Sequence, residues 1–375
     1  MIKIAVIGAS YLQIPLVERI NALGYKSHCF AWESEDSVCK NIADYFYPIS
    51  IIDKESILQK CIEIKIDAIL SIASDVAVPT ISYVADKLGL VANTIESSLI
   101  STNKNLMRSR FKEAGLPTPF YFTVSENRIL DVKSVFQFPL IVKPTDRSGS
   151  RGVTIANNND ELLDNIKKAI SESFEKKAIV EEFIVGNEYS VESISQNGIH
   201  IILAITEKIT SGPPYFVELE HHQPAVLDDD LKNQIYDTVI KGLNALEINN
   251  GAAHSEIKIN EKGIYLIEIG GRMGGDFIGS HLVQLSTGYD YLKNCINVAI
   301  GNKIDTFNNL NSNFSGVYFL SKITQNLMPY FLNTLMNRSD FIEVKLQSAE
   351  FEDVYNSSNR IGYLIYQSDS KLILS

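Results

Sequence analysis

The stretch EIGGRMGGDFIG, residues 268–279, brings a carboxylate, a guanidinium and several glycines together at the end of an expected strand. Arg272 could hold an anion through two parallel hydrogen bonds. Glycine has no Cβ, so a ligand can approach its backbone closely. The glycines concerned are Gly270, Gly271, Gly274 and Gly275. These residue types predict a corner where a metal, a phosphate and a substrate meet.

The residues before this corner, GAAHSEIKINEKGIYLIEIGG, have the pattern of a β-hairpin. A loop of three residues, Glu261 to Gly263, would put Gly263 where such a hairpin needs a left-handed residue. Asn260 would then pair with Ile264. A loop of two residues would shift the pairing by one and turn the carboxylates of the two strands to opposite faces.

With the longer loop, Glu256 lies directly opposite Glu268 on one face of the hairpin. Like charges in that position are unfavourable and require something to offset them. A divalent cation would do so, and hard carboxylate oxygens suit Mg²⁺. The spacing therefore predicts a magnesium site between Glu256 and Glu268.

Residues 138–153, FPLIVKPTDRSGSRGV, form an apolar strand that carries Lys143 and continues into a loop with two glycines and two arginines. Backbone N–H groups in such a loop can bind phosphate oxygens, and the basic side chains add charge. The loop is not a Walker loop, because GxxxxGK[ST] is absent. From the residues alone, a solvated hairpin loop and a phosphate-covering lid both stay open.

Residues 178–192, AIVEEFIVGNEYSVE, form a strand, a break at Gly186 and a second strand. Glu181, Glu182 and Glu188 interrupt the apolar pattern. One interpretation is a solvated strand edge. The other is a base-binding break whose backbone recognises a nucleobase while Glu188 binds a ribose.

The elements that must position these residues follow two different patterns of secondary structure along the chain. The first hundred residues alternate strand and helix patterns, which is typical of a doubly wound parallel sheet. The first turn, GASYLQ, lacks the later glycines of GxGxxG, so no dinucleotide site is expected there. A helix over 103–115 and the break LPTP precede an α+β region of largely antiparallel strands, with helices at 159–173 and 228–246.

We therefore expect a Rossmann-like N-terminal domain, a small lid subdomain, a large subdomain with the metal and substrate site, and a C-terminal subdomain without a chemical motif. Their predicted ranges are 1–100, 101–185, 186–304 and 305–375.

Composition excludes several functional classes. The net charge of −11 argues against bulk nucleic-acid binding and against an anionic membrane as partner. Cys29, Cys39, Cys61 and Cys295 show no metal-type spacing, and unpaired cysteines suit a reducing cytosol. No apolar run approaches the roughly 20 residues of a membrane span. A cytoplasmic homodimer acting on small molecules is expected.

Residues 100–300 carry these features in an order that resembles the ATP-grasp superfamily of carboxylate–amine ligases. Within it, the chain is most similar to the group of L-amino-acid ligases and carbamoyl-phosphate-synthetase-like enzymes. The matching segments are NKNLMRSRF with Lys104, PLIVKP with Lys143, DRSGSRGV, VEEFIVGNEYSVE, YFVELEHHQPA, and SEIKI followed by IEIGGRMGGD. The resemblance rests on their order and spacing, and it implies an ATP-grasp fold after the N-terminal domain.

The resemblance also implies a nucleotide site. Lys104 and Lys143 would contact the phosphates of ATP, and Glu188 would bind its ribose. A strap would hold adenine through backbone contacts, and a small loop would close over the phosphates. The strap residues are Glu181, Glu182, Phe183 and Ile184. The loop residues are Ser148, Gly149 and Ser150.

The same resemblance implies that Glu256 and Glu268 bind two Mg²⁺ ions, or Mn²⁺ in their place. Arg272 would meet the transferred phosphate and the acyl-phosphate. Many ATP-grasp members have E-x-N after the second metal carboxylate, whereas Gly270 stands at that Asn position here. A third metal contact must then come from elsewhere, with Glu218 as the candidate.

In the amino-acid ligase branch, an acidic residue and a His from an E-x-x-H stretch face the substrate. These positions match Glu218 and His221, although simple strand alternation would place Glu218 with Glu220 and His222 instead. Further expected substrate contacts are Gly274, Gly275 and Asp276, the last touching an ammonium group. The remaining histidines, His28, His200, His254 and His281, are expected to be structural.

The activity implied is a ligation in two steps. A substrate carboxylate would be phosphorylated by Mg-ATP, and an amine would then attack the acyl-phosphate, with release of ADP and phosphate. Amino-acid or dipeptide ligation is the expected reaction. Two alternatives stay open: a bicarbonate-activating carboxylase of the purine-pathway type, and a nucleotide-binding regulatory protein without turnover. The sequence does not identify the carboxylate or the amine.

Overall fold

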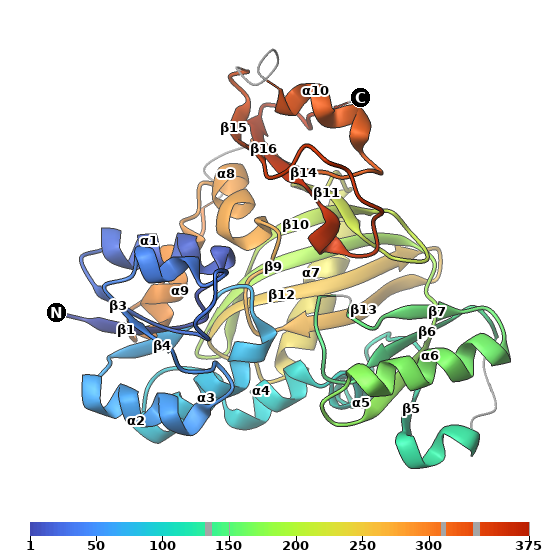
Figure 1. Cartoon of the computed structure of the whole chain (residues 1–375), viewed down its shortest axis with the longest axis horizontal. Coiled ribbons are helices and arrows are strands. Elements are labelled where there is room, and N and C mark those ends of the chain that lie inside the picture. The colour runs from blue at the N-terminus through green and yellow to red at the C-terminus, as the bar shows by residue number, and fades with distance from the viewer. Residues whose placement is uncertain (132–136, 150, 309–312, 333–337, 375) are drawn as a thin grey trace.

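The computed structural model describes residues 1–131, 137–149, 151–308, 313–332 and 338–374. Three sheets organise these residues (Figure 1). The first is a four-stranded parallel sheet with the order β3-β2-β1-β4. Its strands are β1 (Lys3–Ile7), β2 (Lys26–Phe30), β3 (Tyr45–Tyr47) and β4 (Ala68–Leu70), and the helices between and after them are α1 (Ile14–Ala22), α2 (Lys54–Ile64) and α3 (Val78–Leu88).

The first turn of this sheet is closed by a side chain. Gly8 has a φ of 113°, and a Cβ there would meet Cγ of Gln13 at 3.3 Å. The Gln13 side chain is buried and exchanges hydrogen bonds with the backbone of Ile72. Gln13 thus fills the space beside the turn.

The second sheet is small and antiparallel, with the order β5-β8-β6-β7. Its strands are β5 (Tyr121–Ser125), β8 (Lys177–Glu182), β6 (Leu140–Pro144) and β7 (Thr154–Ala156), and α6 (Asn159–Glu172) packs against them. The helix begins where the Asn158 side chain accepts a hydrogen bond from the Glu161 N–H. Leu162, Ile166 and Ala169 then recur at helical spacing and are buried against the sheet.

The third sheet crosses the middle of the molecule and has eight strands, each antiparallel to its neighbours (Figure 1). Their order is β13 (Gly263–Gly270), β12 (Gly251–Asn260), β9 (Asn187–Gln196), β10 (Ile199–Thr210), β11 (Glu218–Gln223), β14 (Phe314–Leu320), β16 (Gly362–Ser368) and β15 (Phe341–Leu346). One face is apolar and packs on α7 (Asp229–Ala245) through Ile235, Val239 and Leu243. The other face, called the polar face below, carries charged side chains on β9, β10, β11, β12 and β13, and becomes apolar at β14 and β16 through Val317, Phe319 and Ile365.

The remaining helices connect these units. They are α4 (Ile95–Thr102), α5 (Lys104–Glu113), α8 (Val283–Thr287), α9 (Tyr291–Ala299) and α10 (Met328–Phe331). The structure confirms a parallel sheet followed by an α+β region, and the helices predicted at 159–173 and 228–246. The predicted C-terminal unit adds β14, β15 and β16 to the central sheet, and the division into four units stays a prediction.

Two bulk expectations can also be compared with the structure. All four cysteines are buried and free. Within the described ranges, the search for a helix long and apolar enough to span a membrane found none.

Candidate functional site

The polar face of the central sheet collects charged side chains in rows that run across the strands. One row pairs Lys258 with Glu188, Glu188 with Lys208, and Lys208 with His221. The next row pairs Glu268 with Glu256. Successive side chains of a strand point to opposite faces, so a row keeps its members on one side. The alternate residues, including Tyr189, Val191 and Ile257, are buried against α7.

The Glu256–Glu268 pairing arises in a different way from the one predicted. Asn260 pairs with Gly263, so the hairpin turn has two residues and not three. By itself this turn would separate the two carboxylates. The register shifts after Ile257, where Ile267 forms a β-bulge and leaves Glu256 opposite Glu268. The prediction of a three-residue loop was wrong. The pairing of Glu256 with Glu268 that was derived from that loop is nonetheless present, because the bulge restores it.

Each of the two carboxylates has its own lysine. Glu256 Oε1 lies 2.9 Å from Lys208 Nζ and 3.5 Å from His254 Nε2. Glu268 Oε2 lies 3.2 Å from Lys104 Nζ. Burial alone would raise the pKa of Glu256, but Lys208 and His254 hold it well below its usual value. The cost of opposing two carboxylates is therefore offset by protein cations, so the register does not by itself require a metal.

The pair nonetheless fits magnesium chemistry. Mg²⁺ in nucleotide enzymes is held by one or two carboxylates together with phosphate oxygens. Across the described part of the chain, no group of three or more His, Cys, Asp or Glu side chains could hold a metal ion. Glu256 and Glu268 thus suit an ion that is shared with a nucleotide and do not form a complete protein cage.

Lys143 and Glu181 belong to a buried charge cluster. Glu181 Oε2 lies 2.7 Å from Lys143 Nζ, and Glu181 Oε1 accepts a hydrogen bond of 2.6 Å from Arg108 Nε on α5. Burial would raise the pKa of Glu181, but Arg108 and Lys143 lower it to about 2. Removing one partner of such a buried pair typically costs about 3–5 kcal/mol, since a charge is left unpaired. The Glu181 side chain therefore positions Lys143.

The loop after Lys143 contacts α5. Lys104 Nζ donates a hydrogen bond of 2.7 Å to the Arg147 carbonyl, which places a predicted phosphate-binding lysine beside this loop. Ser148 is half-buried, and Gly149 is exposed with a φ of 64°. Ser150, also predicted for the loop, lies outside the described residues.

The predicted adenine strap links the small sheet to the central one. The Glu182 N–H donates to the Phe120 carbonyl, so this donor already has a partner. Phe183 lies under the ammonium of Lys258, 5.1 Å from ring centre to Nζ, and Ile184 is buried. At Gly186 a Cβ would lie 2.4 Å from the Ile259 carbonyl oxygen, so this position requires glycine.

Lys208 joins the ribose and metal candidates and was missed in the sequence. Its Nζ lies 3.1 Å from Glu188 Oε1 as well as 2.9 Å from Glu256 Oε1. Burial would lower its pKa, but these two carboxylates raise it well above the ordinary value. The strand GIHIILAITEKIT offered a weak signal, because Lys208 is the one lysine of a largely apolar segment.

A second β-bulge orients the E-x-x-H residues on β11. Thr210 pairs with Glu218 and Ile209 with Glu220, so Leu219 is the extra residue. The bulge puts Glu218 and His221 on the polar face and leaves His222 on the other. There His222 Nδ1 lies 2.9 Å from the Tyr366 hydroxyl. His221 is thus the histidine on the face that carries Glu256.

Glu218 is not adjacent to the metal candidates. β9 and β10 lie between β11 and β12, which corresponds to roughly 14 Å across the sheet. The Glu218 carboxylate instead accepts a hydrogen bond of 2.7 Å from Ser357. The expectation that Glu218 supplies a third metal contact is therefore not supported by this geometry.

The substrate candidates at 274–276 are held by unexpected partners. The Gly274 N–H donates to the buried carboxylate of Glu192, and a Cβ there would clash with that side chain at 2.6 Å. Gly275 has open space around it. Asp276 accepts two hydrogen bonds, of 2.6 and 2.7 Å, from Arg360. Its carboxylate also lies 3.9 Å from His221 Nε2.

Arg360 is the second residue that the sequence did not reveal. Its guanidinium lies 3.8 Å from the centre of the Phe319 ring, and its Nε donates to the Ser357 carbonyl. Burial would raise the pKa of Asp276, but Arg360 and His221 lower it strongly. Asp276 also stands at a φ of 49°, an uncommon conformation for a residue with a side chain. No local motif around Arg360 indicates this long-range contact.

His254, expected to be structural, lies within the charged rows. Its Nδ1 is 2.5 Å from Glu192 Oε1, and its Nε2 faces Glu256. Burial would lower its pKa, but Glu192 and Glu256 raise it. Burial lowers the pKa of His221, and Asp276 does not outweigh that effect. Two buried histidines of one face therefore shift in opposite directions.

Arg272 contacts the N-terminal part of the chain. Its Nε and Nη2 each lie 2.9 Å from an oxygen of Asp75, and its Nη1 donates to the Met273 carbonyl. Asp75 follows β4 of the parallel sheet, so the predicted phosphate-binding arginine is held by a residue from another sheet.

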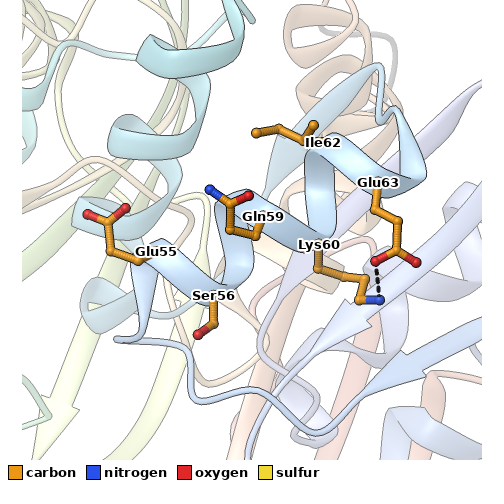
Figure 2. A pocket seen from close by; sticks show the side chains of 6 residues that line it. All are labelled: Glu55, Ser56, Gln59, Lys60, Ile62 and Glu63. Carbon is orange, nitrogen blue, oxygen red and sulfur yellow. Dashed lines mark hydrogen bonds and ion pairs between the residues drawn. The ribbon is translucent and has the colours of Figure 1, made fainter.

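A surface depression elsewhere has none of this chemistry. It lies along one exposed side of α2, and the side chains that line it are Glu55, Ser56, Gln59, Lys60, Ile62 and Glu63 (Figure 2). The ion pair drawn there joins Lys60 and Glu63, one helical turn apart. Pairs at this spacing are ordinary on solvated helices. We take this feature as surface and not as a site.

Comparison with known proteins then identifies the family of the central region. Residues 136–280 match the family model described as an ATP-grasp domain. The chain contains an ATP-grasp domain. The alanine–anticapsin ligase of Bacillus subtilis is 29% identical over 277 residues, covering 63% of this chain and 57% of that ligase. The chain therefore spans little more than half the length of this relative.

Solved structures share the fold of nearly the whole chain. The L-amino acid ligase from Bacillus licheniformis has a TM-score of 0.83 at 22% identity, covering 99% of this chain and 94% of that one. The N5-carboxyaminoimidazole synthetase from Staphylococcus aureus complexed with ADP has a TM-score of 0.78 at 17% identity, covering 98% and 94%. Such identities show the fold alone, and the two proteins differ in their reactions.

Proposed function

We propose that the protein is an ATP-dependent ligase that phosphorylates a substrate carboxylate and joins the acyl group to an amine, with release of ADP and phosphate. Amino-acid or dipeptide ligation is the reaction we favour. The observation that carries the proposal is the single polar face on which Glu256 and Glu268 lie with Lys104 and, farther across the sheet, with Glu218 and His221. This arrangement would give a phosphate region and a substrate region on one surface, which supports the proposal.

The phosphate region would act by positioning and by neutralising charge. Lys104 and Lys143 would bind ATP phosphates, and the loop at 146–152 would close over them and exclude water, which would hydrolyse the acyl-phosphate. The strap at 181–184 and Glu188 would hold the nucleoside. Mg²⁺ bound by Glu256 and Glu268 would supply charge neutralisation for the transferred phosphoryl group.

Lysine partners support this assignment. Lys104 lies beside Glu268 and Lys208 beside Glu256, so each carboxylate has a protein cation next to it in the absence of Mg²⁺. Arg272 would meet the phosphate as it is transferred, through the N–H groups of Nη1 and Nη2 that do not donate to Asp75 or Met273.

The substrate region would bind the carboxylate donor and the amine. Glu218 and Asp276 are the acidic groups that would meet an ammonium group, and Gly274 and Gly275 would let the substrate approach the backbone. Burial keeps His221 neutral near pH 7 by lowering its pKa. Its Nδ1 is buried without a hydrogen-bond partner among the described residues, so a neutral acceptor is available for a proton from the attacking amine.

An ADP-release screen tests the proposal. Each amino acid is supplied singly and in pairs with Mg-ATP, and bicarbonate alone serves as a control. We expect ADP release to rise sharply only when a suitable amino-acid carboxylate and an amine acceptor are both present. Full activity with bicarbonate alone would show a carboxylase, and ATP binding without turnover for every pair would show a regulatory protein. Either result would overturn the proposal.

A further inference from the structure

The space above Gly270 is occupied by a residue from another part of the chain. Gly270 lies on the polar face, two residues after Glu268, where the resemblance to other ATP-grasp proteins leads one to expect an asparagine. A Cβ on Gly270 would lie 2.9 Å from Oδ1 of Asp75 and 3.4 Å from the guanidinium carbon of Arg272. A side chain at position 270 would therefore collide with the Asp75–Arg272 pair.

Asp75 reaches this place from the parallel N-terminal sheet. It opens the short helical turn Asp75–Ala77 that follows β4, whereas Gly270 ends β13 of the central sheet. Asp75 is 14% exposed and Arg272 15%. Two parallel hydrogen bonds of 2.9 Å join them, and such a bidentate pair fixes the plane of the guanidinium as well as its position.

A third contact of the Arg272 guanidinium is with the backbone, and one N–H on Nη1 and one on Nη2 are left for a ligand. Nη1 donates a 2.9 Å hydrogen bond to the Met273 carbonyl, so all three nitrogens have protein acceptors. Lys104 and His254 are close enough to contribute to the electrostatic surroundings of Asp75. Asp75 therefore lies at the polar face of the central sheet, although it follows β4 of the parallel N-terminal sheet.

We propose that Asp75 is a positioning residue of the ligase site: it holds Arg272 in the orientation that meets the transferred phosphate, and it does so from the space that a side chain at position 270 would fill. The inference rests on the proposed function, because the phosphate role of Arg272 does. It makes the N-terminal sheet a part of the active site and explains why position 270 is glycine in this chain.

The first test removes the carboxylate. Asp75→Asn keeps the size but loses the charge and one acceptor, and Asp75→Ala opens the space. Misplacing a catalytic group can cost up to about a hundredfold in rate. We expect kcat to fall at least about tenfold in Asp75→Asn and further in Asp75→Ala, with the KM for ATP within about threefold of wild type. An unchanged kcat in Asp75→Asn would overturn the inference.

A matched control separates positioning from general loss of contact between the N-terminal region and the rest. Arg19 on α1 forms an ion pair with Asp290, which precedes α9, away from the charged rows. Arg19→Met removes that pair and should leave kcat within about twofold of wild type, because it does not orient Arg272. A fall as large as that in Asp75→Asn would contradict the positioning role.

The clash at Gly270 gives a sharper test through a double-mutant cycle. Gly270→Ala alone should lower kcat about tenfold, since its methyl group displaces the Asp75 carboxylate. In the Asp75→Ala background the same change meets only the ordinary 3.4 Å contact with Arg272 and should lower kcat no more than about twofold, so the two effects would be strongly non-additive. Additive effects would mean that position 270 does not act through Asp75.

A binding measurement distinguishes failure of this inference from failure of the proposed function. Inorganic phosphate is titrated into the Mg-ADP-loaded protein and followed by calorimetry. We expect Arg272→Met and Asp75→Ala to weaken phosphate binding by a similar factor, about tenfold or more. If no substrate pair supports turnover but this pattern holds, the ligase proposal fails and the Asp75 role stands. If turnover occurs and Asp75→Ala binds phosphate like wild type, the Asp75 role fails alone.

Discussion

The phosphate region and the substrate region of the polar face are built from different parts of the chain. Around Glu256 and Glu268, the partner Lys104 lies in a segment with a recognisable pattern, although Lys208 was missed. Around His221 and Asp276, the deciding partner is Arg360, which comes from the C-terminal strands. Under the proposed function, the phosphate chemistry would be inferable from motifs, whereas the substrate preference would depend on the Arg360–Asp276 contact, which no motif encodes.

Both regions also depend on a β-bulge. Ile267 restores the opposition of Glu256 and Glu268, and Leu219 brings Glu218 onto the face of His221. An extra residue in one strand changes which side chains share a face. The two regions therefore meet on one surface only because both irregularities are present.

The largest expected effect is at the metal pair. Glu268→Gln keeps the size of the side chain but removes a ligand charge, so Mg-dependent turnover should fall by about a hundredfold or more, and Glu256→Gln should weaken it severely. ATP binding measured without Mg²⁺ should barely change. Glu261→Gln, on the exposed turn of the same hairpin, is the matched control. Wild-type turnover in either site variant would remove the two-carboxylate assignment.

The next effect should appear at the substrate region. Arg360→Met removes the two hydrogen bonds to Asp276, so the Arg360 side chain no longer holds the backbone of 276–277 in its left-handed conformation. We expect the KM for the amino-acid substrate to rise about tenfold while the KM for ATP stays within about twofold. Steady-state kinetics measures both values. Arg338→Met, which breaks a more exposed pair with Asp340, should change neither.

If Arg360→Met raised the KM for ATP instead, the separation of the face into a phosphate and a substrate region would be wrong. An equal rise in the KM for ATP and the KM for the amino-acid substrate would indicate a global effect. Far-UV circular dichroism of the variant would check that the fold is retained.

Much of the fold could be read from the sequence. Alternating strand and helix patterns predicted the parallel sheet, and the antiparallel region followed from successive hairpin patterns. The turn at 261–262 was assigned one residue too many, because Gly263 fits a left-handed position in either loop. Its φ of 135° is compatible with glycine in both cases. The bulge that compensates has no sequence signature.

The site could be predicted in part. The hairpin pattern predicted that Glu256 and Glu268 lie opposite each other, which the structure confirms, and the strand before the glycine-containing loop predicted Lys143 as a phosphate contact, which stays a prediction. Asp75 and Arg360 could not be found in this way, because each meets its partner across a large sequence separation and between different elements. Long-range contacts of this kind are set by how the sheets pack, which local patterns do not specify.

Histidine titration sharpens the comparison further. Burial lowers the pKa of His221, and Glu192 and Glu256 raise that of His254 despite burial. Relative to the ordinary value of 6.5, His254 should titrate at higher pH and His221 at lower pH. NMR of the imidazole signals, assigned with His221→Asn and His254→Asn, measures both. Titration of both on the same side of 6.5 would contradict the electrostatic account.

The same shifts give opposite contributions to stability. A raised pKa means that His254 stabilises the folded protein below 6.5 and that this contribution is lost as pH rises through its folded pKa. A lowered pKa means that His221 does not reduce the free energy of unfolding above pH 6.5 and destabilises the folded protein as the pH falls below 6.5. Each contribution is the difference between the wild type and its own histidine variant in chemical unfolding measured from pH 5 to 8.

The smallest expected effect is protection of the loop at 146–152. If the loop closes over nucleotide, Mg-ATP should slow cleavage by trypsin at Arg147 and Arg151. Cleavage at Lys262, on the exposed hairpin turn, serves as an internal control and should not change. Equal cleavage at both arginines with and without nucleotide would count against a lid.

The most direct test of the account follows an oxygen atom. The amino acid that supports ADP release is labelled with ¹⁸O in its carboxylate, and the released phosphate is analysed by mass spectrometry together with the nucleotide product. An acyl-phosphate route transfers one carboxylate oxygen to the phosphate, so the account predicts ADP and singly labelled phosphate in equal amounts. AMP as the stoichiometric product, or phosphate without label, would contradict it.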